Sequence, residues 1–136
     1  MTRALLLLAV LALSAPALAD EVYRGTMTCD IIPGLTNGPG ALPFEVTVSG
    51  ASASYQREIG RQGGGRIGQV EVGSGRLEGG QLKLAGNAAT RSFNYSASYA
   101  GTVQNEELRL SGEQIWNVSN GVSGFHRGCR ARLKRG

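Results

Sequence analysis

Apolar and polar side chains alternate along most of the chain that follows Asp20. Between residues 92 and 99, aromatic and alanine side chains take every second position and the positions between them are polar. The same alternation recurs in residues 44–48 and 23–31. Strict alternation indicates β-strands that bury one face in an antiparallel sheet. No stretch after Asp20 keeps apolar residues at helical spacing, so we expect an all-β protein.

Turn residues divide this pattern into separate strands. Residues 79–80 (Gly-Gly), 105–106 (Asn-Glu) and 120–121 (Asn-Gly) stand between alternating runs, where Gly-Gly and Asn-Gly favour the positive φ angles of tight hairpins. Longer connections are expected at residues 33–42 and 60–66. The expected strands cover residues 21–31, 43–49, 53–59, 67–72, 75–78, 81–86, 92–104, 107–117 and 124–134.

An internal similarity relates residues 75–86 to residues 101–112. Glycine begins and ends both segments, and leucine or valine occupies three equivalent positions in each. Repeat architectures need at least about three copies, so the similarity favours two successive hairpins of a meander. The many glycines suit sharp strand bends in a small sheet.

The first 19 residues have the organisation of a secretory signal peptide. A basic residue near the start precedes a short apolar run at residues 4–12, and small residues at 17–19 end at a cleavage point. The apolar run is shorter than the roughly 20 residues of a membrane-spanning helix. We therefore expect cleavage after Ala19, a periplasmic or secreted protein, a single domain over residues 20–136 and no transmembrane segment in it.

The two cysteines are expected to form a disulfide that joins the ends of the sheet. Cys29 and Cys129 fall on the apolar faces of the first and last expected strands. An exported small domain oxidises such a pair, and there is no Cys-x-x-Cys spacing to indicate redox chemistry. The bridge brings the first and last strands together, and closure removes the exposed edges of a meander. We expect a closed or nearly closed β-barrel of eight or nine antiparallel strands, with a two-sheet β-sandwich as the alternative.

Composition excludes several classes of function. The 136 residues include one histidine and two cysteines, too few for a zinc ribbon, and we expect neither a metal nor a cofactor. His126 could act as a catalytic base, but the sequence contains no Gly-x-Ser-x-Gly nucleophile motif. The glycines at 63–65 are not followed by the Lys-Ser/Thr pair of a phosphate-binding loop. The carboxylates considered for acid–base chemistry fall mostly on polar strand faces or at turns: Asp30, Glu45, Glu58, Glu71, Glu78, Glu107 and Glu113. We therefore expect a protein that is not an enzyme.

The last strand carries the strongest charge pattern, in a chain whose formal net charge is +4. One of its faces is a row of cations: His126, Arg130, Arg132 and Lys134. Arg57, Arg61 and Arg66 near the second long connection would extend this positive stripe. The stripe predicts a binding module for an anionic partner, either an envelope component or an acidic protein. The same cations would also keep an edge strand soluble. Nucleic acid is not an expected partner, because no motif for it is present.

Aromatic residues give a second hypothesis. Four of them are candidates to line a cavity inside the barrel: Tyr55, Phe93, Tyr95 and Trp116. Such residues usually fill a small barrel, but some eight-stranded barrels hold one small ligand, so a carrier of a small apolar ligand is the alternative function. At Trp116, beside Ile115, we expect a β-bulge or an exposed indole.

A short segment also resembles part of a known family. Residues 49–55, Ser-Gly-Ala-Ser-Ala-Ser-Tyr, are similar to the Ser/Gly-rich segment ending in tyrosine of the periplasmic inhibitors of c-type lysozyme. The resemblance covers seven residues with different spacing, and no functional residue is carried over from the family. It implies a third function, inhibition of a secreted hydrolase.

Overall fold

The computed structural model describes residues 19–36, 39–59, 69–121 and 123–136. Residues 1–18 of the expected signal peptide lie outside these ranges. So does the connection at 60–66, with Arg61 and Arg66.

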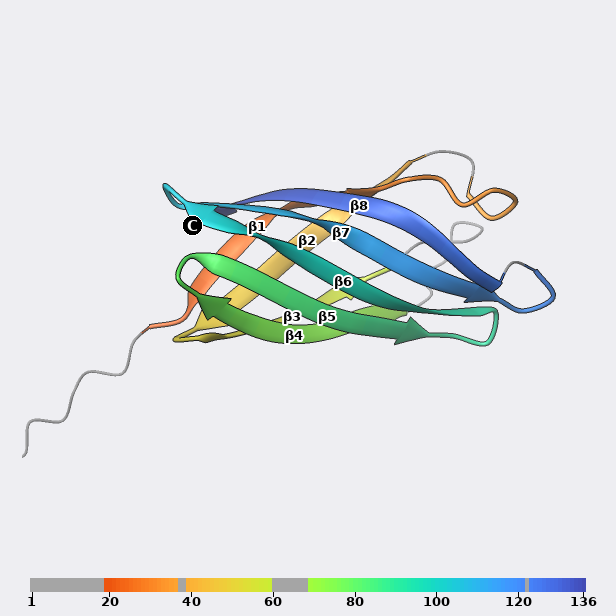
Figure 1. The fold of residues 1–136 in the computed structure, drawn as a ribbon, viewed down its shortest axis with the longest axis horizontal. Helices are drawn as coiled ribbons and strands as arrows, with labels where there is room; N and C mark the ends of the chain where they lie inside the picture. Colours follow the sequence, from red (N-terminus) through yellow and green to blue (C-terminus); the bar gives the residue numbers. More distant parts are fainter. Residues whose placement is uncertain (1–18, 37–38, 60–68, 122) are drawn as a thin grey trace, which may run out of the picture.

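Eight antiparallel strands follow one another around a closed barrel (Figure 1). They are β1 (Glu21–Cys29), β2 (Gly40–Ser49), β3 (Ser52–Glu58), β4 (Val70–Glu78), β5 (Gln81–Ala89), β6 (Phe93–Gln104), β7 (Glu107–Val118) and β8 (Ser123–Arg135). Each strand pairs with its neighbours in sequence, and β1 pairs with β8 to close the sheet. The prediction of an all-β barrel is confirmed, and the sandwich alternative is wrong. No helix in the described part of the chain is long and apolar enough to cross a membrane.

The alternation in the sequence becomes the inside and outside of the barrel. In β6, Tyr95, Ala97 and Tyr99 are buried while the residues between them are exposed. Successive side chains of a strand point to opposite faces, so every second residue enters the interior. The register therefore decides which side chains meet inside.

The sequence predicts two strands at residues 67–72 and 75–78, but the described part of this stretch is the single strand β4. Gly73 and Gly75 keep the ladders with β3 and β5 unbroken. A Cβ at Gly75 would lie 1.7 Å from the Lys83 carbonyl oxygen, and one at Gly101 would lie 1.6 Å from that of Arg109. These glycines are equivalent in the two similar hairpins. The internal similarity therefore marks two places where neighbouring backbones come too close for a side chain.

The barrel has two unlike ends (Figure 1). At the closed end, the turns β2–β3, β4–β5 and β6–β7 are tight, with positive φ at residues 50, 79–80 and 105–106. The described chain also begins and ends here. At the opposite end, which we call the open end, β1, β3, β5 and β7 finish and β2, β4, β6 and β8 begin.

Apolar side chains fill the closed half of the barrel. The buried residues there include Tyr23, Val46, Val48, Ala53, Leu82, Leu108 and Leu133. The disulfide lies toward the other end, where Cys29 and Cys129 are direct partners in the β1–β8 ladder. The predicted bridge is therefore confirmed, and it links the strands on either side of the closing seam.

Candidate functional site

A buried carboxylate lies inside the barrel toward the open end. Glu71, the second residue of β4, is 0% exposed. It accepts hydrogen bonds from the hydroxyls of Tyr55 (2.6 Å), Tyr95 (2.5 Å) and Tyr99 (3.0 Å). Arg57, itself 5% exposed, forms an ion pair with it at 2.9 Å. One guanidinium and three phenols therefore replace the water that a carboxylate would otherwise bind.

The register explains why these groups meet. Arg57 and Glu71 are direct partners in the β3–β4 ladder, so their side chains lie on the same face of the sheet. Both are buried, so this face is the inner one. Glycine leaves room for Tyr55, because a Cβ at Gly73 would lie 2.2 Å from the ring and one at Gly86 would lie 2.1 Å from the hydroxyl. Small residues on β4 and β5 thus make space for a large one on β3.

Two expectations from the sequence are wrong here. Glu71 does not lie on a polar outer face, and Arg57 does not extend the positive stripe on the surface. The inward positions of β4 hold Glu71, Gly73 and Gly75, whereas the apolar Val72 points outward and is 49% exposed. A prediction that places apolar residues inside therefore assigns the wrong face of β4 to the interior. The alternation of β3 could have identified this network. It places Arg57 on the same inner face as Tyr55, and a buried guanidinium requires a buried acidic partner.

Gln114 connects this network to Arg127. The fully buried Gln114 amide donates to the Tyr99 hydroxyl (2.8 Å), and its oxygen accepts from Trp116 Nε1 (2.9 Å) and Arg127 Nε (2.8 Å). The Arg127 guanidinium also lies over the Trp116 indole, 4.8 Å from the ring centroid. Sequence reasoning missed Gln114 and Arg127, although Arg127 has the parity of inward-facing Cys129 on β8.

The structure settles the expectation at Trp116. A register shift between β7 and β8 falls after Trp116, because Trp116 pairs with Phe125 and Asn117 pairs with Ser123, which leaves Gly124 of β8 unpaired. The exposed indole is wrong, because Trp116 is 5% exposed. The irregularity follows Trp116, so the indole keeps the inward direction that Gln114 also has.

A hollow of about 300 Å³ opens among these side chains at the open end. Its aromatic wall consists of Phe93, Tyr95 and Trp116, with Tyr95 and Phe93 centroids 4.4 and 4.7 Å from that of Trp116. Arg57 and Arg127 also line the hollow. Apolar residues that complete the lining include Leu35, Leu42 and Ile59. Three of the four predicted cavity residues thus meet here.

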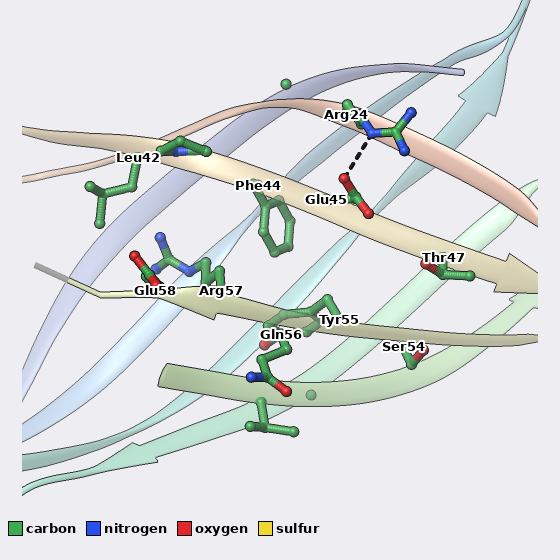
Figure 2. Close-up of a pocket in the computed structure, with 14 residues that line it drawn as sticks. Arg24, Leu42, Phe44, Glu45, Thr47, Ser54, Tyr55, Gln56, Arg57 and Glu58 are labelled. Carbon is green, nitrogen blue, oxygen red and sulfur yellow. Dashed lines mark hydrogen bonds and ion pairs between the residues drawn. The ribbon is translucent and has the colours of Figure 1, made fainter. Parts of the chain in front are cut away.

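Tyr55, the fourth predicted cavity residue, lines a different hollow. This one, of about 930 Å³, follows a gap between β2 and β3, which pair only from residue 47 to 49 and from 52 to 54. Figure 2 shows Phe44 on β2 near Tyr55 on β3, whose ring centroids are 5.1 Å apart. An exposed Arg24–Glu45 ion pair lies on its outer rim (Figure 2). The gap is an open groove with many exposed polar residues, whereas the 300 Å³ hollow penetrates the interior.

Burial and charge set the protonation of the interior network. Burial and the nearby Glu71 carboxylate raise the pKa values of the Tyr55, Tyr95 and Tyr99 hydroxyls, so all three stay protonated as donors at neutral pH. Burial lowers the pKa of Arg57, but Glu71, Tyr95 and Tyr99 together raise it by more, so the pKa is raised overall. Burial lowers the pKa of Arg127, although a guanidinium stays charged in proteins.

The predicted cationic row of β8 lies on the outer surface. His126, Arg130, Arg132 and Lys134 are all exposed. Three of them contact carboxylates, in the pairs His126–Glu113, Arg130–Asp30 and Arg132–Glu107. These carboxylates partly neutralise the row, so its electric field is weaker than the charges of β8 alone imply.

The segment that resembles the lysozyme inhibitors forms the β2–β3 hairpin at the closed end. Its Tyr55 points into the barrel and donates to Glu71, so this hydroxyl is not presented on the surface. Within the described ranges, no group of three His, Cys, Asp or Glu side chains is placed to hold a metal ion. Protein-family models and curated proteins, when compared with this chain, give no match.

Proposed function

We propose that this protein binds a small organic molecule in the hollow at the open end of its barrel. The observation that carries the proposal is the aromatic wall of Phe93, Tyr95 and Trp116, which borders an open hollow. Ligand sites are mostly apolar hollows with a few placed polar groups, and they measure roughly 300–1,000 Å³. A hollow of about 300 Å³ accommodates a small ligand.

The polar network supports the proposal because it holds the wall in place. Tyr95 is tied by its hydroxyl to Glu71, and Trp116 by its N–H to Gln114. Both hydrogen-bond partners are completely buried. A wall that is rigid before binding loses little conformational entropy when a ligand arrives.

The geometry favours this site over the outer face of β8. The cations of that face contact neighbouring carboxylates, and exposed pairs of this kind contribute little. The interior hollow instead combines apolar surface with the buried guanidinium of Arg57 and the half-buried guanidinium of Arg127.

We also propose that the protein works outside the cytoplasm. The signal peptide expected over residues 1–19 and the Cys29–Cys129 disulfide support this setting. Cell fractionation and the intact mass of the purified chain test it. A chain beginning at Asp20 in the periplasm or medium is the expected result, and a full-length cytoplasmic chain would contradict it.

Trp116 is the sole tryptophan of the chain, so its fluorescence reports directly on the site. Native mass spectrometry of the protein purified from its own cells, together with titration by one- and two-ring compounds, tests the proposal. We expect saturable changes in Trp116 emission, or a bound small molecule.

Phe93→Ala keeps the reporter and removes part of the wall, so it should weaken binding by about tenfold. Val103→Ala, on the same strand toward the closed end, should change it by less than about twofold. A folded protein that purifies bare and shows no saturable emission change with any compound would refute the proposed site.

A further inference from the structure

We propose that the molecule bound in this hollow is a small organic monoanion, and that Arg127 holds its acidic group. This inference rests on the proposed function, because it names the chemical class of the ligand for the same site. Two observations support it: the balance of charges inside the barrel, and the lack of a carboxylate partner for the Arg127 guanidinium among the described residues.

Arg127 is a half-buried cation, and the groups of the described residues that it contacts are neutral. Nε donates to the Gln114 side-chain oxygen, Nη1 donates to the Asp30 backbone carbonyl at 3.3 Å, and Trp116 lies under the plane. The Asp30 carboxylate is directed instead to Arg130.

No carboxylate of the described residues forms an ion pair with Arg127. The remaining stretches of the chain, residues 1–18, 37–38, 60–68 and 122, contain no Asp or Glu in their sequence. All ten acidic side chains of the chain therefore belong to described residues. The chain supplies Arg127 with no acidic partner of its own.

Among the described residues, the charges inside the barrel do not balance. Glu71 contributes one negative charge and Arg57 one positive charge, and the two form a buried ion pair. The three phenols bound to Glu71 are neutral donors. Arg127 therefore leaves one uncompensated positive charge beside the hollow. A charge withdrawn from water is unfavourable unless an opposite charge meets it, and a monoanion would supply that charge.

The guanidinium also has donors to offer. Its Nη2 makes no hydrogen bond to any described residue, while Nε and Nη1 are held by Gln114 and Asp30. The bond to Gln114 and the Trp116 ring orient the plane of the group. A carboxylate or sulfonate matches such a planar donor group. The apolar body of the ligand would then lie along the aromatic wall.

The test compares two dyes of nearly the same shape and different charge. 8-Anilinonaphthalene-1-sulfonate is a monoanion, and N-phenyl-1-naphthylamine lacks the sulfonate and is neutral. Both are titrated into the folded, oxidised protein, and binding is followed by dye fluorescence and by Trp116 emission. We expect the wild type to bind both dyes and to bind the anion more tightly.

Arg127→Gln should weaken binding of the anionic dye by about tenfold or more and leave the neutral dye within about twofold. Arg127→Lys, which keeps the charge without the planar group, should fall between. Arg130→Gln is the matched control, because it makes the same change on the outer face of β8 and should alter neither dye. Circular dichroism and the unfolding temperature confirm that each variant is folded.

The outcomes separate the two proposals. Equal effects of Arg127→Gln on both dyes, or no effect on the anionic dye, would overturn the assignment of an anion while the neutral dye still supports the hollow as a site. Failure of the wild type to bind either dye would count against both proposals.

Discussion

The two ends of this barrel are built from the same eight strands and hold different chemistry. At the closed end, inward positions carry Leu82, Leu108 and Val48, which need no polar partner. Toward the open end, β3 and β4 direct Arg57 and Glu71 inward. One alternating pattern thus produces an apolar core at one end and a polar network at the other.

This difference in chemistry indicates which end contributes more to the stability of the fold. Burying an aliphatic side chain contributes roughly 1.5–3 kcal/mol. A buried ion pair often contributes nothing beyond what apolar residues of the same volume would, because both ions lose their water. The closed end therefore supplies stability through apolar burial, whereas Glu71 of the Arg57–Glu71 pair at the open end holds the hydroxyl of Tyr95 in the wall of the hollow.

The largest effect is expected where a charge would be stranded. Glu71→Gln leaves Arg57 buried without its counter-charge and should lower the free energy of unfolding by about 3–5 kcal/mol in urea titrations. Replacing both residues, as Glu71→Gln with Arg57→Met, should recover a large part of this loss. If the double variant were no more stable than the single one, stranding of the Arg57 charge would not be the cause.

At the closed end, Leu108→Ala tests whether stability and binding are separate. Leu108 is 0% exposed, and its truncation should lower the free energy of unfolding by about 3 kcal/mol. Dye binding at the open end should stay within about twofold of the wild type while the variant remains folded. A larger change in dye affinity would show that the two ends are coupled.

Alkaline pH should weaken the open end through its tyrosines. The pKa values of Tyr55, Tyr95 and Tyr99 are raised by burial and by Glu71, while in the unfolded chain they are about 10. Above pH 10 the folded state therefore holds more protons than the unfolded state, and stability falls as pH rises.

Each of these tyrosines should contribute a slope of about 1.4 kcal/mol per pH unit, and below pH 10 their contribution is fully present. Urea titrations between pH 8 and 11.5 measure the slope. Tyr95→Phe should make it shallower, and an unchanged slope in that variant would argue against Tyr95 as a source.

The smallest effect is expected on the outer surface. Arg132→Gln removes an ion pair with Glu107 on the outer surface and should lower the free energy of unfolding only slightly. High salt should reduce the difference further. A larger loss would mean that the outer face of β8 contributes more to stability than its exposure implies.

Much of the architecture was predictable because it depends on local signals. Alternation located most strands, and turn residues located the hairpins at 79–80 and 105–106. Cys29 and Cys129 on the first and last strands indicated the closing bridge. The division of β4 failed because Gly73 and Gly75 resemble turn residues in sequence, whereas in the barrel they allow close packing.

The candidate site was predictable only in part. Alternation placed Phe93 and Tyr95 on the inner face of one strand, and together with Trp116, another predicted cavity residue, they line one hollow. Parity did not identify Glu71, because the apolar residue beside it, Val72, points outward. It also did not show that Arg127 has a tryptophan and an amide as partners in place of a carboxylate.

The sequence by itself determined most strands and the turns, because side-chain period and turn geometry depend on residues close together in the chain. It also indicated the bridge, because it contains only two cysteines and both fall on apolar strand faces. It also determined how many acidic groups the protein has. Only the tertiary structure decided that Arg57, Glu71, Gln114 and Arg127 meet, since they come from β3, β4, β7 and β8. Contacts such as that between Gln114 and Glu71, 43 positions apart, exist only once the barrel closes in one register.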